Sequence, residues 1–154
     1  MNRTKLIFTA LLTLSLIFSA FTLTACNENA TESVSGSITV VVAGTKTESF
    51  TVSLDGLDTS RGFVAALDAL KAEGKLDYGI TDTFLDYVGE VKNNYEKGEY
   101  IYVYTSVEAD QDVSVMRHSI TYEGRELVSA GVGAAEMTLQ DGAVIYVAPH
   151  TPKW

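Results

Sequence analysis

The sequence predicts an α+β fold in which one main crossover helix covers a mixed sheet. Two short alternating runs at residues 37–43 and 48–54 flank a glycine-containing turn, a pattern typical of a β-hairpin. From residue 61 the apolar period becomes that of a helix. The last run, residues 143–148, is apolar on both faces, like a central strand in a covered sheet. This order predicts a β-grasp-like sheet, with the last strand parallel beside the first.

The opening hairpin has one apolar face in each strand. Side chains alternate between the two faces of a strand, so every second residue points the same way. The residues expected to point inward are Ile38, Val40 and Val42 in the first strand and Phe50, Val52 and Leu54 in the second. Between the strands, residues 44–47 form the turn.

The helix that follows is amphipathic. Phe63, Leu67 and Leu70 fall on one helical face, and charged residues fall on the other. Gly74 is well placed to end the helix, because glycine adopts the left-handed conformation common at helix C-termini. We therefore expect the helix to cover one face of the sheet.

Residues 78–94 fit either a short strand or a helical turn. The extended interpretation is favoured, because Gly79 and Gly89 would interrupt a helix. Downstream, residues 119–123 and 125–129 flank Gly124 and predict a second hairpin. This hairpin is the inserted β segment of the predicted fold.

A strand at residues 99–106 carries three tyrosines, Tyr100, Tyr102 and Tyr104, on one face. Two interpretations are open. The tyrosines can pack under the helix or the inserted segment as core. Alternatively, they can form an amphipathic platform for a flat ligand or a protein partner. The glycine-rich stretch with Gly131 and Gly133 can adapt its backbone to such a partner. These five residues are the candidate ligand-binding residues.

Cys26 is the only cysteine, and it ends the stretch Leu23-Thr24-Ala25-Cys26 behind an uncharged apolar segment. Arg3 and Lys5 precede that segment, as in a signal peptide. The arrangement resembles a bacterial lipoprotein signal, in which the cysteine is lipidated and begins the mature chain. A permanent transmembrane helix and an ordinary signal peptide are the alternatives. The lipobox resemblance favours lipidation at Cys26.

This interpretation divides the chain into four parts. Residues 1–25 are the signal peptide, 26–36 the lipidated cysteine and a flexible tether, 37–148 the β-grasp-like domain and 149–154 a C-terminal tail. The acylated Cys26 would hold the domain in the lipid bilayer of the cell membrane, at its extracytoplasmic face. We expect the domain to be a monomer.

Acidic residues dominate the part of the chain after Cys26. All 20 Asp and Glu residues lie there, and the whole sequence carries a formal net charge of −9. Nucleic-acid binding depends on Lys and Arg neutralising phosphates, so nucleic acid is not an expected partner. Protein charge would not attract anionic lipid either, which leaves the acyl group as the membrane contact.

No catalytic or metal-binding constellation is evident. A nucleophile elbow at Ser129 would need a glycine two residues earlier, where the chain has Leu127. Residues 110–121 lack the Gly and Glu of a calcium loop and predict a solvated acidic loop. His118 and His150 have no partner at ligand spacing and are expected to be surface residues rather than zinc ligands. We therefore expect a protein that is not an enzyme and holds no metal.

Four stretches together resemble a known family. They are residues 63–71, 84–91, 98–106 and 139–146, and they occur in the family's order. Together they resemble the transcobalamin-like C-terminal domain of bacterial surface proteins and lipoproteins, over roughly Ser37 to Val147, with residues 107–135 as extra sequence. The resemblance implies a β-grasp (ubiquitin-like) fold and cobalamin, or a related corrinoid, as the possible ligand. No other cofactor is expected.

Two functions remain open at this point. The first is a non-enzymatic module that binds a small molecule, with the corrinoid implied by the resemblance. The second is a protein-interaction or structural module at the cell surface. Both place an unknown small molecule or surface protein at the tyrosine strand and the segment after it, because the opening hairpin's outward residues, such as Thr39 and Thr51, are small and polar.

Overall fold

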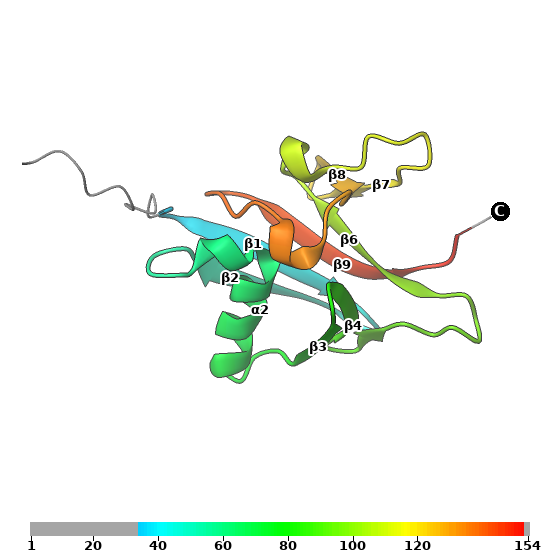
Figure 1. Ribbon diagram of the computed structural model, residues 1–154, viewed down its shortest axis with the longest axis horizontal. Coiled ribbons are helices and arrows are strands. Elements are labelled where there is room, and N and C mark those ends of the chain that lie inside the picture. Colours follow the sequence, from blue (N-terminus) through cyan, green and yellow to red (C-terminus); the bar gives the residue numbers. More distant parts are fainter. Residues whose placement is uncertain (1–33, 153–154) are drawn as a thin grey trace, which may run out of the picture. The chain divides into compact units, whose positions relative to one another are not determined.

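The main sheet has six strands in the order β2-β1-β9-β6-β8-β7 in the computed structural model, which describes residues 34–152 (Figure 1). A second sheet has the order β3-β4-β5. The strands of the main sheet are β1 (Ser37–Ala43), β2 (Thr47–Ser53), β6 (Tyr100–Thr105), β7 (Ser119–Tyr122), β8 (Arg125–Ser129) and β9 (Val144–His150). The remaining elements are α2 (Phe63–Ala72), β3 (Tyr78–Thr81), β4 (Phe84–Val88), β5 (Val91–Lys92) and the 3₁₀ helices η1 (Thr59–Arg61), η2 (Glu108–Asp110) and η3 (Ala134–Glu136).

The strand pairing confirms the predicted α+β, β-grasp-like sheet. β1 pairs with β2 antiparallel and with β9 parallel, and β9 pairs with β6 antiparallel. The crossover helix α2 lies between the opening hairpin and the remaining strands in sequence. β9 extends two residues past the predicted end, because Pro149 and His150 still pair with Ile101 and Tyr100 of β6.

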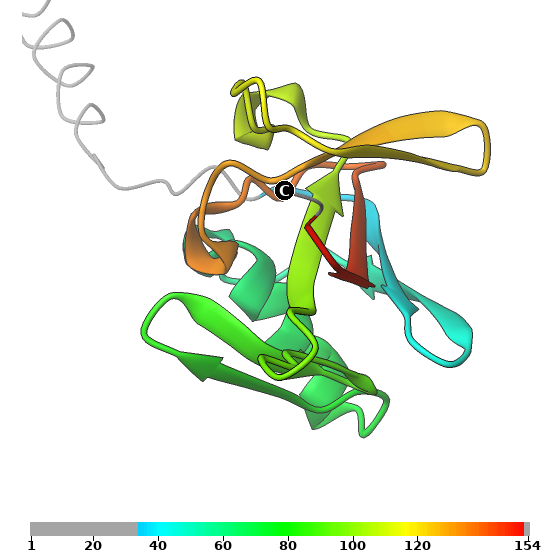
Figure 2. The same cartoon turned by 90° about the vertical axis from the view of Figure 1, so that its right-hand side faces the viewer.

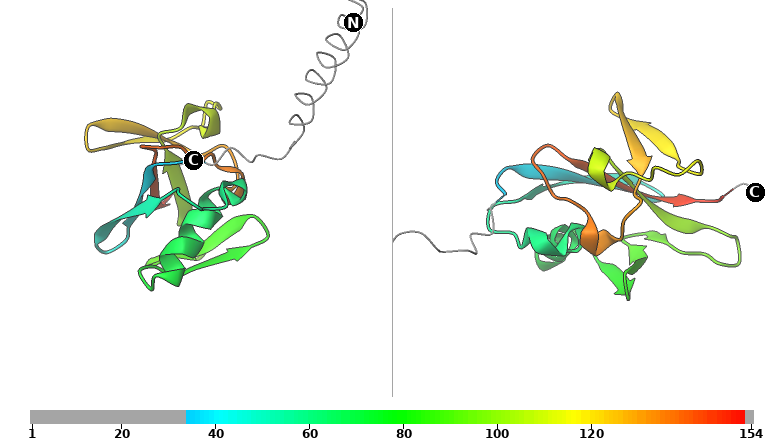
Figure 3. Two further views of the ribbon diagram at one scale, coloured as in Figure 1. Left: turned by 90° about the vertical axis from the view of Figure 1, so that its left-hand side faces the viewer. Right: turned by 45° about the horizontal axis from the view of Figure 1, so that its top comes forward.

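The main core lies on the side of the sheet covered by α2. Phe63, Leu67 and Leu70 of the helix are fully buried there, together with Ile38 and Val40 of β1. The second sheet packs into the same core, and Figures 1 and 3 show it on the same side as α2. Residues 78–92 are therefore extended, as predicted, and they complete the cover that one ten-residue helix leaves unfinished.

The inserted hairpin β7–β8 covers part of the opposite face. Leu127 of β8 is fully buried against Val41, Tyr104 and Val144. Half-buried tyrosines, among them Tyr146, pack around this second cluster. The insertion thus buries a face that the basic sheet and helix would leave to solvent.

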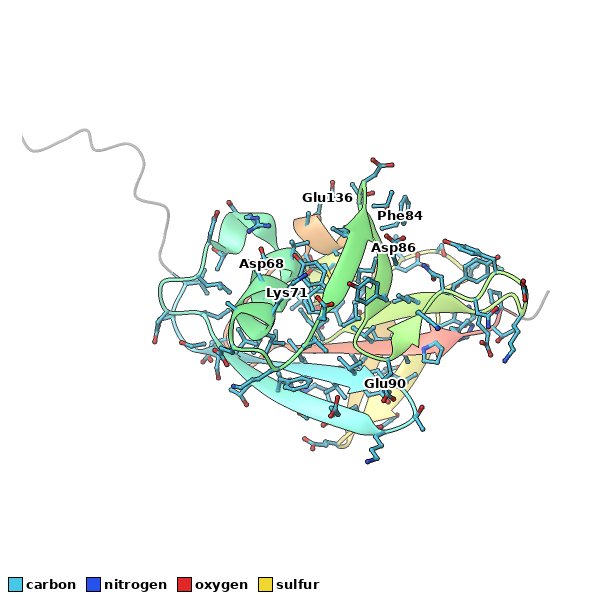
Figure 4. The ribbon with its side chains drawn as sticks, turned by 90° about the horizontal axis from the view of Figure 1, so that it is seen from below. Asp68, Lys71, Phe84, Asp86, Glu90 and Glu136 are labelled. Carbon is cyan, nitrogen blue, oxygen red and sulfur yellow. The ribbon has the colours of Figure 1, made fainter. Side chains whose placement is uncertain are left out.

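Polar contacts join α2 to the second sheet (Figure 4). The Tyr78 hydroxyl donates to Asp68 Oδ1 at 2.6 Å, and Arg61 forms an ion pair with the same carboxylate at 2.6 Å. Lys71 pairs with Asp77 at 2.8 Å. The hydrogen bond from Tyr78 is the largest cause of the lowered pKa of Asp68. Burial, followed by the Asp68 contact, raises the pKa of Tyr78 to about 12.

We expect Tyr78→Phe to lower the free energy of unfolding by about 1 kcal/mol at neutral pH, the usual contribution of one hydrogen bond. Because the folded-state pKa of Tyr78 lies above the unfolded value near 10, its contribution is complete below pH 10 and is lost as the pH rises towards about 12. Urea unfolding of both proteins from pH 7 to pH 12 measures this. A difference that stays constant up to pH 12 would contradict the assignment.

Among the residues described, no helix has the length and apolar character needed to cross a bilayer.

Candidate functional site

A groove of about 750 Å³ runs along the edge of β6 that faces away from β9. Its lining comes from the start of β4, the β5–β6 connection, the loop before β7 and the segment after β8. Figure 2 shows β6 with the second sheet below it and the orange η3 segment beside it. The volume falls in the range of about 300–1,000 Å³ that is usual for ligand sites.

The floor of the groove is an incompletely paired strand edge. β8 pairs with β6 only at Tyr104 and Thr105, so residues 100–103 have no strand beside them on this side. The N–H of Ile101 donates to Asn93 Oδ1 at 2.8 Å, and the C=O of Val103 accepts from the N–H of Ala130 at 2.7 Å. The even-numbered residues of β6 direct their backbone groups towards β9, as the register requires.

Two backbone groups on this edge remain for a ligand. They are the C=O of Ile101 and the N–H of Val103, and within residues 34–152 neither has a hydrogen-bond partner. Ligand sites commonly place a few polar groups of this kind in an apolar surround, where they fix the orientation of the ligand.

Exposed apolar side chains gather at this groove. Phe84 is 76% exposed, Tyr95 71%, Met116 60% and Tyr100 40%, and all four line it. The other two large apolar side chains exposed within the described part of the chain, Val113 and Val115, belong to the same loop as Met116. Exposed apolar side chains that gather at one place on a protein mark a site of interaction.

The charged side chains in the groove lining are both acidic. Asp112 lies on the loop before β7, and Glu136 lies on η3 near Phe84 (Figure 4). Asp112 accepts hydrogen bonds from the backbone N–H and the hydroxyl of Ser114, which hold the pKa of its carboxyl below the ordinary value. Glu136 accepts from the N–H of Gly133 at 3.3 Å. The rim is therefore anionic at neutral pH.

Asp110 fixes the wall formed after β8. Its side chain is only 4% exposed and accepts from the N–H and the hydroxyl of Thr138, at 2.7 and 2.9 Å. Its backbone C=O accepts from the N–H of Gly131 at 2.8 Å. The prediction of a solvated acidic loop is wrong at Asp110, because two hydrogen bonds and its position under the segment before β9 make it a buried structural residue.

The five predicted ligand-binding residues separate into two groups. Tyr100, Tyr102, Gly131 and Gly133 line the groove. Tyr104 does not: it is 3% exposed and belongs to the cluster under the inserted hairpin. A platform of three tyrosines is therefore wrong at Tyr104, because Leu127 of the hairpin packs over that end of the strand.

Gly131 does not serve the predicted role of an adaptable backbone. A Cβ there would lie 3.0 Å from the Cα of Asp112, so the glycine allows two chain segments to approach closely. Its N–H is also held by Asp110. Cys26 lies outside the described residues.

Sequence reasoning missed Phe84, Asn93 and Met116. Phe84 begins a strand predicted only as extended, Asn93 lies just before a turn, and Met116 lies in a loop, so none belongs to a periodic run. The signal available was limited to the unusual number of large apolar residues in the loop, Val113, Val115 and Met116.

The two histidines are adjacent, although the sequence showed them as isolated. Their ring centroids lie 4.3 Å apart, and Tyr102 packs on His150 at 4.4 Å. Burial, and then the neighbouring His118, lower the pKa of His150. Both rings are half-buried rather than fully exposed. No group of three or more His, Cys, Asp and Glu side chains within residues 34–152 is arranged to hold a metal ion.

No family model matches the chain, and no curated protein matches it. Among solved structures, it is similar to a crystal structure from Ruminococcus gnavus ATCC 29149 described as a "putative metal binding protein". The two chains are 15% identical, the match covers 77% of this chain and 99% of the other, and the TM-score is 0.46.

Proposed function

We propose that this protein is a lipid-anchored, extracytoplasmic binding module, not an enzyme, and that its ligand binds in the groove beside β6. One observation carries the proposal: the exposed large apolar side chains of the described residues collect in the groove and in the loop that forms its wall. The incompletely paired β6 edge supplies polar groups at the same place. The anchor and the location rest on the sequence around Cys26.

Lipidation at Cys26 is tested directly. We expect Cys26→Ala to block lipid attachment and to leave the precursor unprocessed at that site, because the thiol is the only cysteine sulfur available for acylation. Metabolic labelling with an alkynyl fatty acid, together with intact-protein mass spectrometry, measures both effects. A variant that matures and partitions into detergent like the parent would overturn the anchor.

A corrinoid is the small-molecule candidate, and it comes from the resemblance to the transcobalamin-like domain. The groove suits one flat apolar face, because Phe84, Tyr95 and Tyr100 are exposed beside it. No imidazole lines it: His118 and His150 pack on Tyr102, but neither is a lining residue. The lining residues could therefore hold a corrinoid through its face and periphery, without supplying an axial nitrogen from histidine.

The deciding experiment is mass spectrometry of small molecules retained by the purified protein, followed by titration with cyanocobalamin. We expect a retained compound, or cyanocobalamin, to bind the parent and to bind Phe84→Ser at least tenfold more weakly. Tyr122→Ser is the control, because Tyr122 is a half-buried tyrosine that does not line the groove. Equal binding by all three proteins would remove the groove as the small-molecule site.

A protein-interaction module is the second candidate. The exposed apolar side chains favour it, because they are not confined to the groove. Phe84, Tyr95 and Met116 line the groove, and Val113 and Val115 continue onto the neighbouring loop. Exposed apolar side chains gathered in one region mark sites of contact with other proteins.

A further inference from the structure

We infer that the groove takes one extended segment of a partner polypeptide, apolar with basic residues, which adds along the open edge of β6. The inference rests on the proposed function, since it names the occupant of the same groove. Its basis is the hydrogen-bonding pattern of β6 together with the side chains and charges around it.

The two unpaired backbone groups match one residue of an added strand. The C=O of Ile101 and the N–H of Val103 flank Tyr102 on the groove side. In a parallel ladder, one partner residue donates its N–H to the residue before its neighbour and accepts from the residue after it. A peptide residue opposite Tyr102 would make both bonds. An antiparallel segment would use the same two groups, but from two peptide residues, one on each side of the residue opposite Tyr102. It could not extend the ladder through the N–H of Ile101 or the C=O of Val103, because Asn93 and Ala130 occupy them.

Apolar walls stand on both sides of this edge. Phe84 and Tyr95 lie on the side of the second sheet, and Met116 and Val132 lie on the side of the segments around β8. An extended peptide directs alternate side chains to opposite sides, so its apolar residues would reach both walls. Strand addition of this kind takes affinity from the main chain and specificity from alternate side chains.

The charge of the rim favours a basic segment. Asp112 and Glu136 are the charged residues of the lining, and the chain as a whole has a formal net charge of −9. Lys or Arg beside the apolar residues of the peptide would face these carboxylates, whereas acidic residues would be repelled.

The outer edges of the main sheet are less suitable. β2 exposes Thr47, Glu48 and Thr51, and β7 exposes Ser119 and Thr121. Polar and charged side chains on an edge strand discourage pairing with another chain. Among the main-sheet edges within residues 34–152, the groove-side edge of β6 combines unpaired backbone groups with exposed aromatic side chains.

The test begins with a phage library of random twelve-residue peptides, selected on the full chain in mild detergent. We expect enriched peptides with alternating apolar residues and at least one Lys or Arg. Their affinity should fall at least tenfold with Phe84→Ser, whose side chain is 76% exposed and contributes little to folding. Tyr122→Ser, which changes a residue outside the groove lining, should leave the affinity unchanged.

A scan of backbone N-methylation along the best peptide then tests strand addition. One position should lose at least tenfold in affinity, because its N–H donates to the C=O of Ile101. On the protein, amide exchange at Val103 should slow at least tenfold on binding, while exchange at Thr121 on β7 stays unchanged.

The outcomes separate the inference from the proposed function. Strand addition would be overturned if the selected peptides bind Phe84→Ser as tightly as the parent, or if no N-methylation weakens binding. It would also be overturned if amide exchange at Val103 does not slow on binding. If no peptide is enriched, and cyanocobalamin or a retained compound binds the parent more tightly than Phe84→Ser, the inference is wrong. The groove then remains a small-molecule site. If no probe depends on Phe84, both are wrong.

Discussion

Asp110→Ala is expected to lower the free energy of unfolding by about 3 kcal/mol. Its buried carboxylate accepts from the N–H and the hydroxyl of Thr138, and a hydrogen bond to a charged group is worth about 1.5–3 kcal/mol. Alanine would leave the Thr138 N–H without a partner in a part-buried position. Urea unfolding followed by circular dichroism measures the loss.

Two variants make this prediction specific. Asp110→Asn keeps an oxygen acceptor for the Thr138 N–H, so it should lose about half as much. Glu108→Ala, two residues away and exposed, should change stability by less than about 0.5 kcal/mol. If Glu108→Ala and Asp110→Ala unfold at the same urea concentration, Asp110 does not anchor the segment before β9.

Loss of Asp110 should also weaken binding in the groove. The side chain of Asp110 holds Thr138 at one end of the segment 131–138 that forms a wall of the groove, and alanine would release that end. The backbone C=O that holds Gly131 at the other end remains in the variant. Affinity measured well below the unfolding transition should therefore fall for Asp110→Ala more than for Glu108→Ala.

The fold followed from local patterns where one pattern had one structural solution. The apolar residues of β1 alternate, the residues of α2 repeat with helical spacing, and the two-sided β9 requires a central place in the sheet. Gly79 favoured extended structure because glycine interrupts a helix, and the structure adds a second reason that the sequence could not show. A Cβ at that position would collide with the ring of Tyr87 on the neighbouring strand β4.

The site was predictable only in part, because it is assembled from segments distant in sequence. The strand with Tyr100 and the stretch with Gly131 were identified, since each is unusual by itself. The opposite wall could not be identified, because Phe84 acquires its role only when the second sheet lies beside β6. The contact between His118 and His150 has the same origin. The two residues are distant in sequence, and they meet because His150 ends β9 beside His118.

Sequence periodicity could not predict how deeply each tyrosine of β6 is buried. Tyr100, Tyr102 and Tyr104 share a face by alternation, yet they range from 40% exposed to 3% exposed. The difference comes from the inserted hairpin, which covers the Tyr104 end and leaves the Tyr100 end open. Alternation predicts the face of a strand, whereas the cover over that face depends on a distant segment.

This gradient along β6 leads to the second large effect, at Tyr104. Tyr104→Ser should lower the free energy of unfolding by about 3 kcal/mol, because it removes a buried ring from the cluster with Leu127 and Val144. Its thermal midpoint should fall by roughly 10 °C for a domain of this size. Tyr104→Phe keeps the ring and loses only a long contact of 3.5 Å between the hydroxyl and His150 Nδ1, so it should stay within about 1 kcal/mol of the parent.

Tyr100→Ser should show the reverse pattern. Its ring is 40% exposed and packs edge-to-face on Tyr95, with centroids 5.9 Å apart, so stability should fall by less than about 1 kcal/mol. Binding of cyanocobalamin or of a selected peptide, whichever the parent binds, should weaken at least tenfold, because the ring lines the groove. Tyr102→Ser should lower both the stability and the affinity, since this residue lines the groove and packs on His150. Midpoints and affinities measured together for the three serine variants decide the matter. If Tyr100→Ser lowers the midpoint as much as Tyr104→Ser and the folded fraction binds like the parent, Tyr100 is core and the groove loses its aromatic contact.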